Sequence, residues 1–126
     1  MKRKLRKIHI NNMEYLYSVT DTYHAGTETN TLTVRIFLSG QKKTPLIIEF
    51  LTSDDYFMGQ PLQSGIILIN KITSSEDEVN FNEPGYIRQL ILQGQKKGWT
   101  GTNAMEKQNG LDYLAELGYE TDQLIS

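Results

Sequence analysis

The sequence predicts an α+β fold: an antiparallel meander of about five strands with two C-terminal helices packed on one face. Apolar residues alternate at period two through the first half of the chain, which is typical of strands with one buried face. Two segments near the end show helical spacing instead. No repeat, low-complexity tract or linker divides the chain, so residues 1–126 are expected to form a single domain.

Five segments have strand character: 4–10, 13–20, 31–38, 46–51 and 65–72. The first two are joined at Asn11-Asn12, and asparagine tolerates the positive φ of a tight hairpin. The last is apolar on both faces, which predicts a central or doubly covered strand. Polar segments between the strands are predicted loops: 21–30, 52–64 and 73–83.

Two helices are predicted after the strands. The first covers 84–97, where proline occupies the favoured first position. Ile87, Leu90 and Ile91 form its apolar stripe. Gly98 suits the left-handed position that closes a helix, and Trp99 follows it. The second helix covers 109–117, with an asparagine cap at its start.

One segment resembles a known group of proteins. Its sequence is Pro84-Gly-Tyr-Ile-Arg-Gln-Leu-Ile-Leu-Gln-Gly-Gln-Lys-Lys-Gly-Trp99. It is similar to a segment of short uncharacterised bacterial α+β proteins, in which proline opens a helix and Gly-Trp ends it. Some of those proteins are immunity partners of secreted toxins or lie in mobile gene cassettes. The resemblance therefore implies a bacterial protein-binding role and transfers no catalytic residue.

The charges are distributed unevenly. Five of the 13 basic residues lie in the first seven positions, so the rest of the chain carries a net charge of −7. Because nucleic-acid binding needs a distributed basic face, this balance disfavours it, although Lys2–Lys7 keep it open as an alternative. No apolar run is long enough for a signal peptide or a membrane span, so we expect a cytoplasmic protein without membrane contact.

Two predicted loops are candidate partner-binding surfaces. The acidic loop carries Glu76, Asp77 and Glu78, and such a cluster can steer and meet a basic protein surface. The aromatic loop carries Tyr56, Phe57 and Met58, which are difficult to bury together in a loop. A solvated loop and a core lid are the respective structural alternatives.

Catalytic signals are weak. The sequence lacks cysteine, phosphate-binding glycine loops, zinc motifs and a nucleophile elbow, so no cofactor, metal or catalytic residue is predicted. Asp54, Asp55 and His24 are the polar groups that a small-ligand site or a modest enzyme would use, in a tyrosine-lined pocket between sheet and helices. The favoured interpretation is a non-enzymatic, immunity-like protein-binding module.

Overall fold

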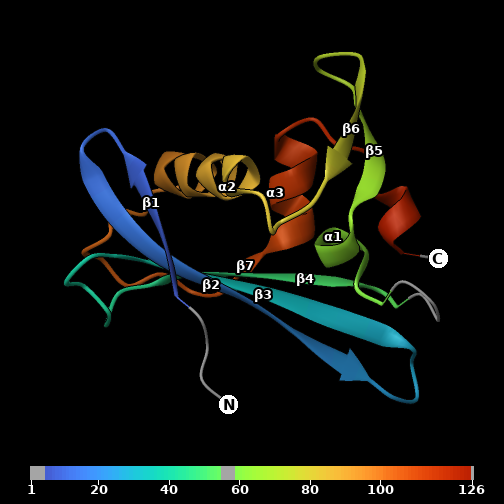
Figure 1. The fold of residues 1–126 in the computed structure, drawn as a ribbon, viewed down its shortest axis with the longest axis horizontal. Coiled ribbons are helices and arrows are strands. Elements are labelled where there is room, and N and C mark those ends of the chain that lie inside the picture. The colour runs from blue at the N-terminus through green and yellow to red at the C-terminus, as the bar shows by residue number, and fades with distance from the viewer. Residues whose placement is uncertain (1–4, 55–58, 126) are drawn as a thin grey trace.

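The computed structural model describes residues 5–54 and 59–125 (Figure 1). It confirms a mixed α and β architecture with a mostly antiparallel five-stranded sheet. The strands are β1 (Arg6–Ile10), β2 (Met13–His24), β3 (Thr29–Leu38), β4 (Leu46–Ser53), β5 (Ile66–Asn70), β6 (Ser75–Val79) and β7 (Gln108–Asn109). The helices are α1 (Pro61–Ser64), α2 (Pro84–Lys96), α3 (Gly110–Glu116) and the 3₁₀ turn η1 (Asp122–Leu124).

The large sheet has the strand order β1-β2-β3-β4-β7. Its first four strands form the predicted antiparallel meander. Asn11 and Asn12 turn the chain between β1 and β2 with φ of 51° and 65°, which confirms the predicted hairpin. Ile8 pairs with Tyr15 and Tyr17 with Ile36, so the alternating apolar residues share one face.

Segment 21–30 was expected to be a loop, and this prediction was wrong except for the turn at residues 25–28. β2 continues to His24 and β3 begins at Thr29, with Asp21 paired to Leu32 and Thr22 to Thr31. The polar residues are compatible with strands because this end of the sheet is only partly covered, so alternation with buried apolar residues is lost. Backbone hydrogen bonds to the neighbouring strand still satisfy the chain.

The prediction of which segment forms the fifth strand of the large sheet was also wrong. Segment 65–72 was expected to extend the meander, but β5 pairs with β6 in a separate two-stranded sheet. The short strand β7 fills the fifth place and runs parallel to β4, with Ile48 opposite Gln108. Two residues of parallel pairing leave no periodic signal in a sequence. A further helix, α1, lies between β4 and β5, so the helices are not confined to the C-terminal part of the chain.

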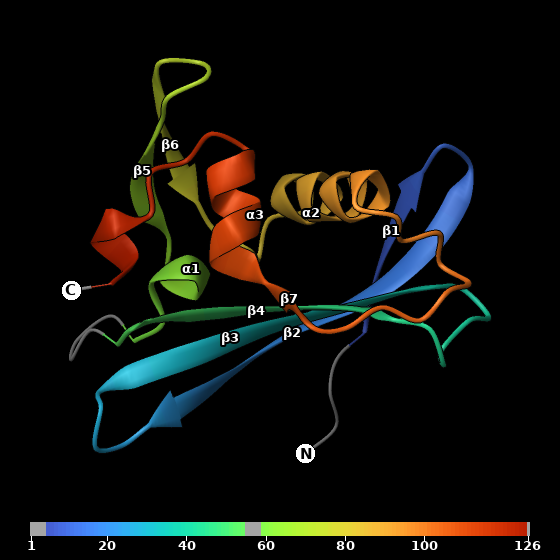
Figure 2. The same ribbon diagram turned by 180° about the vertical axis from the view of Figure 1, so that it is seen from behind.

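Figure 1 and Figure 2 show α1, α2 and α3 on one side of the large sheet, with the β5–β6 hairpin beside them. Two close approaches hold α2 and α3 against β4. A Cβ atom on Gly94 would lie 2.5 Å from Leu46 Cδ2, and one on Gly110 would lie 2.3 Å from Phe50 Cδ2. The sheet–helix interface is therefore filled at these contacts, which argues against a ligand pocket there.

The core joins both sheets. Phe81, directly after β6, packs against Phe50 of β4 with ring centroids 4.8 Å apart. Four tyrosines are core residues with at most 4% of their surface exposed: Tyr15, Tyr17, Tyr113 and Tyr119. The helix predictions are close to the observed bounds, and the Asn109 side chain caps α3 by accepting from Leu111 N.

Candidate protein-binding surface

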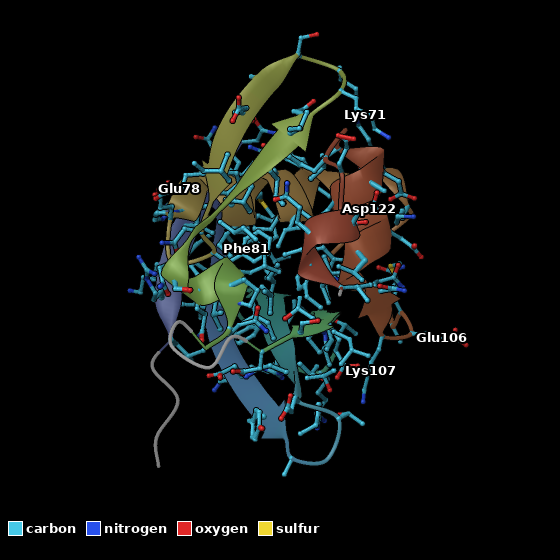
Figure 3. All side chains as sticks on the ribbon, turned by 90° about the vertical axis from the view of Figure 1, so that its right-hand side faces the viewer. Lys71, Glu78, Phe81, Glu106, Lys107 and Asp122 are labelled. Carbon is cyan, nitrogen blue, oxygen red and sulfur yellow. The ribbon has the colours of Figure 1, made fainter. Side chains whose placement is uncertain are left out.

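The β5–β6 hairpin carries the acidic residues that the sequence singled out. Segment 73–83 was expected to be a loop, but Ser75–Val79 form strand β6, so this prediction was wrong. The acidic side chains can occupy a strand because one of its faces is open to solvent, where charges remain hydrated. Figure 3 shows this hairpin from its outer side, with Lys71 toward the tip and Glu78 on the flank.

Strand alternation divides the three acidic residues between two faces. Glu76 and Glu78 are exposed and point outward, whereas Asp77 is half-buried and points toward the body of the protein. In the register of the hairpin, Ile69 lies opposite Glu76 and Ile67 lies opposite Glu78. The acidic cluster predicted as one surface is therefore two separate features.

The outward face is apolar as well as acidic. Ile67 and Ile69 are 53% and 44% exposed, although the sequence predicted a strand covered on both faces. We call Ile67, Ile69, Glu76 and Glu78 the hairpin outer face. An aliphatic pair directly across from two carboxylates offers a partner both apolar area and negative charge on one face.

Asp77 has a structural role. Its Oδ2 accepts a hydrogen bond of 2.9 Å from the hydroxyl of Tyr119, a residue with 4% of its surface exposed. Asn70 reinforces the same attachment, because its Nδ2 donates to Leu117 O at 3.2 Å. These bonds tie the hairpin to the C-terminal segment and hold its outer face in place.

Two tyrosines at this attachment and one on α3 have pKa values raised above the usual value of tyrosine. Burial raises the pKa of Tyr119, and its hydrogen bond to Asp77 adds to the effect. Burial, followed by the charge of Asp77, raises the pKa of Tyr86. Burial also raises the pKa of Tyr113 to about 12, with a smaller contribution from Glu116.

We therefore expect the free energy of unfolding to fall as pH rises from about 10 through about 12. The unfolded chain ionises its tyrosines near pH 10, whereas the folded chain retains their protons to higher pH. Chemical denaturation between pH 9 and 11.5 measures this slope. Tyr113→Phe removes one titrating group and should give a shallower slope, and an unchanged slope would contradict the assignment.

The aromatic candidates Tyr56, Phe57 and Met58, together with Asp55, lie outside the described residues. Asp54 lies at the end of β4 and accepts from the Nδ2 of Asn30 at 2.9 Å. His24 Nε2 lies 2.7 Å from the Thr31 hydroxyl oxygen, within hydrogen-bond distance. The structure does not bring Asp54 and His24 into one hydrogen-bonded site, since each is engaged with a different neighbour.

The basic residues of the N-terminus are represented by Arg6 and Lys7, because Lys2, Arg3 and Lys4 lie outside the described part of the chain. Arg6 Nη1 donates to Asn82 O at 2.8 Å, and its guanidinium lies 5.5 Å from the centre of the Tyr17 ring. These contacts use Arg6 to attach β1 to the segment that follows β6.

Across residues 5–54 and 59–125, no group of three or more acidic or histidine side chains is arranged to hold a metal ion. None of the helices in these ranges combines the length and apolar character needed to span a bilayer. Comparisons with protein-family models, with curated proteins and with solved structures found no match.

Sequence reasoning identified Glu76 and Glu78 but missed Ile67 and Ile69. Both isoleucines belong to a continuous apolar run, Ile66–Ile69, which is typical of a buried strand. The acidic run that follows after a short polar turn was the available signal. A strand paired with consecutive acidic residues has one face that cannot be covered by a core.

Proposed function

We propose that this chain is a non-enzymatic, immunity-like protein-binding module that covers a basic surface of a partner protein with its hairpin outer face. The observation that carries the proposal is the direct pairing of exposed Ile67 and Ile69 with outward-pointing Glu78 and Glu76. The resemblance of residues 84–99 to short bacterial proteins supports the same class.

The two kinds of side chain have different roles in association. Full burial of an isoleucine side chain stabilises a contact by roughly 1.5–3 kcal/mol, so these half-exposed residues can each contribute about 1 kcal/mol. The carboxylates contribute orientation and rate, because complementary charges accelerate encounter and disfavour acidic partners. The net charge of −7 beyond residue 7 acts in the same direction.

The test is an affinity purification of the tagged full chain from the cells that encode it, at low and moderate salt. We expect one stoichiometric protein, whose yield falls as salt rises and is several-fold lower with either Ile67→Thr or Ile69→Thr. Threonine retains the β-branched shape that a strand favours, so the hairpin should remain folded.

Leu51→Thr is the matched control. Leu51 is 52% exposed on β4, in the other sheet, and undergoes the same chemical change. Circular dichroism and thermal melting establish that all three variants are folded. Recovery of the partner at the wild-type yield by both isoleucine variants, or an equal loss of yield with Leu51→Thr, would contradict this surface.

The alternatives receive less support. A pocket between the sheet and the helices is occupied by side chains where α2 and α3 meet β4. Nucleic-acid binding would have to overcome the acidic body of the chain, and Arg6 is already engaged with Asn82 O. Undetectable binding of the intact chain to DNA and RNA at low salt would remove that alternative.

A further inference from the structure

The C-terminal segment continues the small sheet beyond β5. Lys71 N donates to Gly118 O at 2.8 Å, and Glu120 N donates to Ile69 O at 2.9 Å. Asn70 and Tyr119 form an antiparallel bridge between these hydrogen bonds. The backbone at 118–120 therefore occupies the edge of β5 opposite β6, although it is too short to form a regular strand.

This register places Glu120 on the hairpin outer face. Because Asn70 lies opposite Tyr119, Ile69 lies opposite Glu120, and directly paired residues in an antiparallel arrangement point to the same face. Ile69 is also opposite Glu76 on its other side. The three residues thus form a row across the chain segments, with neighbouring backbones about 4.8 Å apart.

Among residues 5–54 and 59–125, the carboxylates of this row and of Glu78 have no basic nitrogen within 4 Å. Among the described residues, the carboxylates with a basic nitrogen within 4 Å belong to Glu14, Glu49 and Glu116. Asp77, which lies on the other face, is the hairpin carboxylate that bonds within the fold, to the Tyr119 hydroxyl. Lys71 follows Ile69 by two residues and ends the acidic face toward the tip of the hairpin (Figure 3).

We propose that the enlarged face, the hairpin outer face plus Glu120, binds a partner segment in which lysine or arginine alternates with apolar residues. This inference rests on the proposed function and names the chemistry of the partner. A basic side chain fits the row because its aliphatic stem covers Ile69 while its charged head reaches Glu76 and Glu120. An apolar side chain of the same segment covers Ile67.

Charge and apolar contact together define the occupant. A second copy of this chain would bring the same carboxylates face to face, and like charges at that spacing are repulsive. A purely polar basic segment would leave Ile67 and Ile69 in water. A partner segment with both properties matches the two isoleucines and the three glutamates of the enlarged face.

The experiment uses the full chain and three synthetic octapeptides, each blocked at both ends: alternating Lys-Val, alternating Lys-Ser and alternating Glu-Val. Binding is followed by NMR amide shifts at low salt. We expect the Lys-Val peptide to bind most tightly and to shift the amides of the enlarged face. We expect Glu120→Gln to weaken it by about threefold, corresponding to one partly exposed ion pair.

Glu106→Gln is the matched control, because Glu106 is exposed, carries the same charge and lies at the far edge of the molecule (Figure 3). Its effect should stay within measurement error. Equal weakening by the two variants, equal binding of Lys-Ser and Lys-Val, or shifts confined to other elements would overturn the proposal.

The two proposals fail separately. A protein partner that depends on Ile67 and Ile69, combined with no preference for the Lys-Val peptide, would leave the binding function standing and reject the basic partner segment. Peptide binding at the enlarged face, with a protein partner that ignores both isoleucines, would reject the proposed function.

Discussion

Replacing Trp99 by alanine is expected to lower the free energy of unfolding by about 3–5 kcal/mol, the usual cost of deleting a buried tryptophan side chain. Trp99 is 1% exposed, and its ring centroid lies 5.9 Å from that of Tyr15 on β2. Its Nε1 donates to Thr44 O at 3.1 Å, so it also holds the turn before β4. A domain of this size has a free energy of unfolding of about 5–15 kcal/mol, so the expected loss is a large fraction of the total.

Urea denaturation followed by circular dichroism measures the effect, since the variant loses the single tryptophan and its fluorescence. Trp99→Phe is the control. It retains an aromatic ring against Tyr15 and loses the hydrogen bond to Thr44 O, with an expected cost of about 1 kcal/mol for that bond plus a smaller packing loss. A Trp99→Ala variant that is no less stable than Trp99→Phe would contradict this account.

Replacing Asn30 by leucine is expected to lower the free energy of unfolding by about 3 kcal/mol, through the loss of the hydrogen bonds that its buried amide makes to two carboxyl groups. Asn30 is 1% exposed, and its Nδ2 donates to Asp21 Oδ2 at 3.0 Å and to Asp54 Oδ2 at 2.9 Å. Its Oδ1 accepts from Gln60 Nε2 at 2.9 Å. This single amide joins β2, β3, the end of β4 and the residue that caps α1.

Asn30→Asp tests the electrostatic part of the argument, because it keeps the shape of the side chain and replaces the donor by a third carboxyl group. Repulsion from Asp21 and Asp54 should raise the pKa of the introduced carboxyl in the folded chain above its unfolded value of about 3.9. The deficit in stability relative to wild type should therefore shrink as pH falls from 7 toward 4. Urea midpoints of both proteins at pH 7 and pH 4.5 measure the difference, and an equal deficit at both values would count against the network.

Elements with strong local signals were predictable. The alternating residues 31–38 and the asparagine pair at the first turn specify a hairpin and a strand from neighbouring positions. Proline at position 84 and glycine at position 98 bound a helix for equally local reasons, and α2 begins and ends where they predict. Gly98 has φ of 110°, the left-handed conformation expected of it.

The partners of β5 were not predictable. A run of four aliphatic residues is consistent with a strand buried on both faces, and the register that leaves Ile67 and Ile69 exposed depends on pairing with β6. The position of Glu120 beside Ile69 depends on a bridge between residues 49 positions apart. No local pattern encodes such a distance.

The sequence by itself determined the mixed α and β class, the first four strands of the meander, the two main helices and an acidic body around a cysteine-free core. These properties follow from periodicity, turn chemistry and charge, which act over a few residues. Only the tertiary structure decided that Asp77 serves the fold while Glu76 and Glu78 face outward. Which face of a strand is buried and which is exposed depends on the neighbouring elements, because burial is a property of the assembled layers and not of the strand alone.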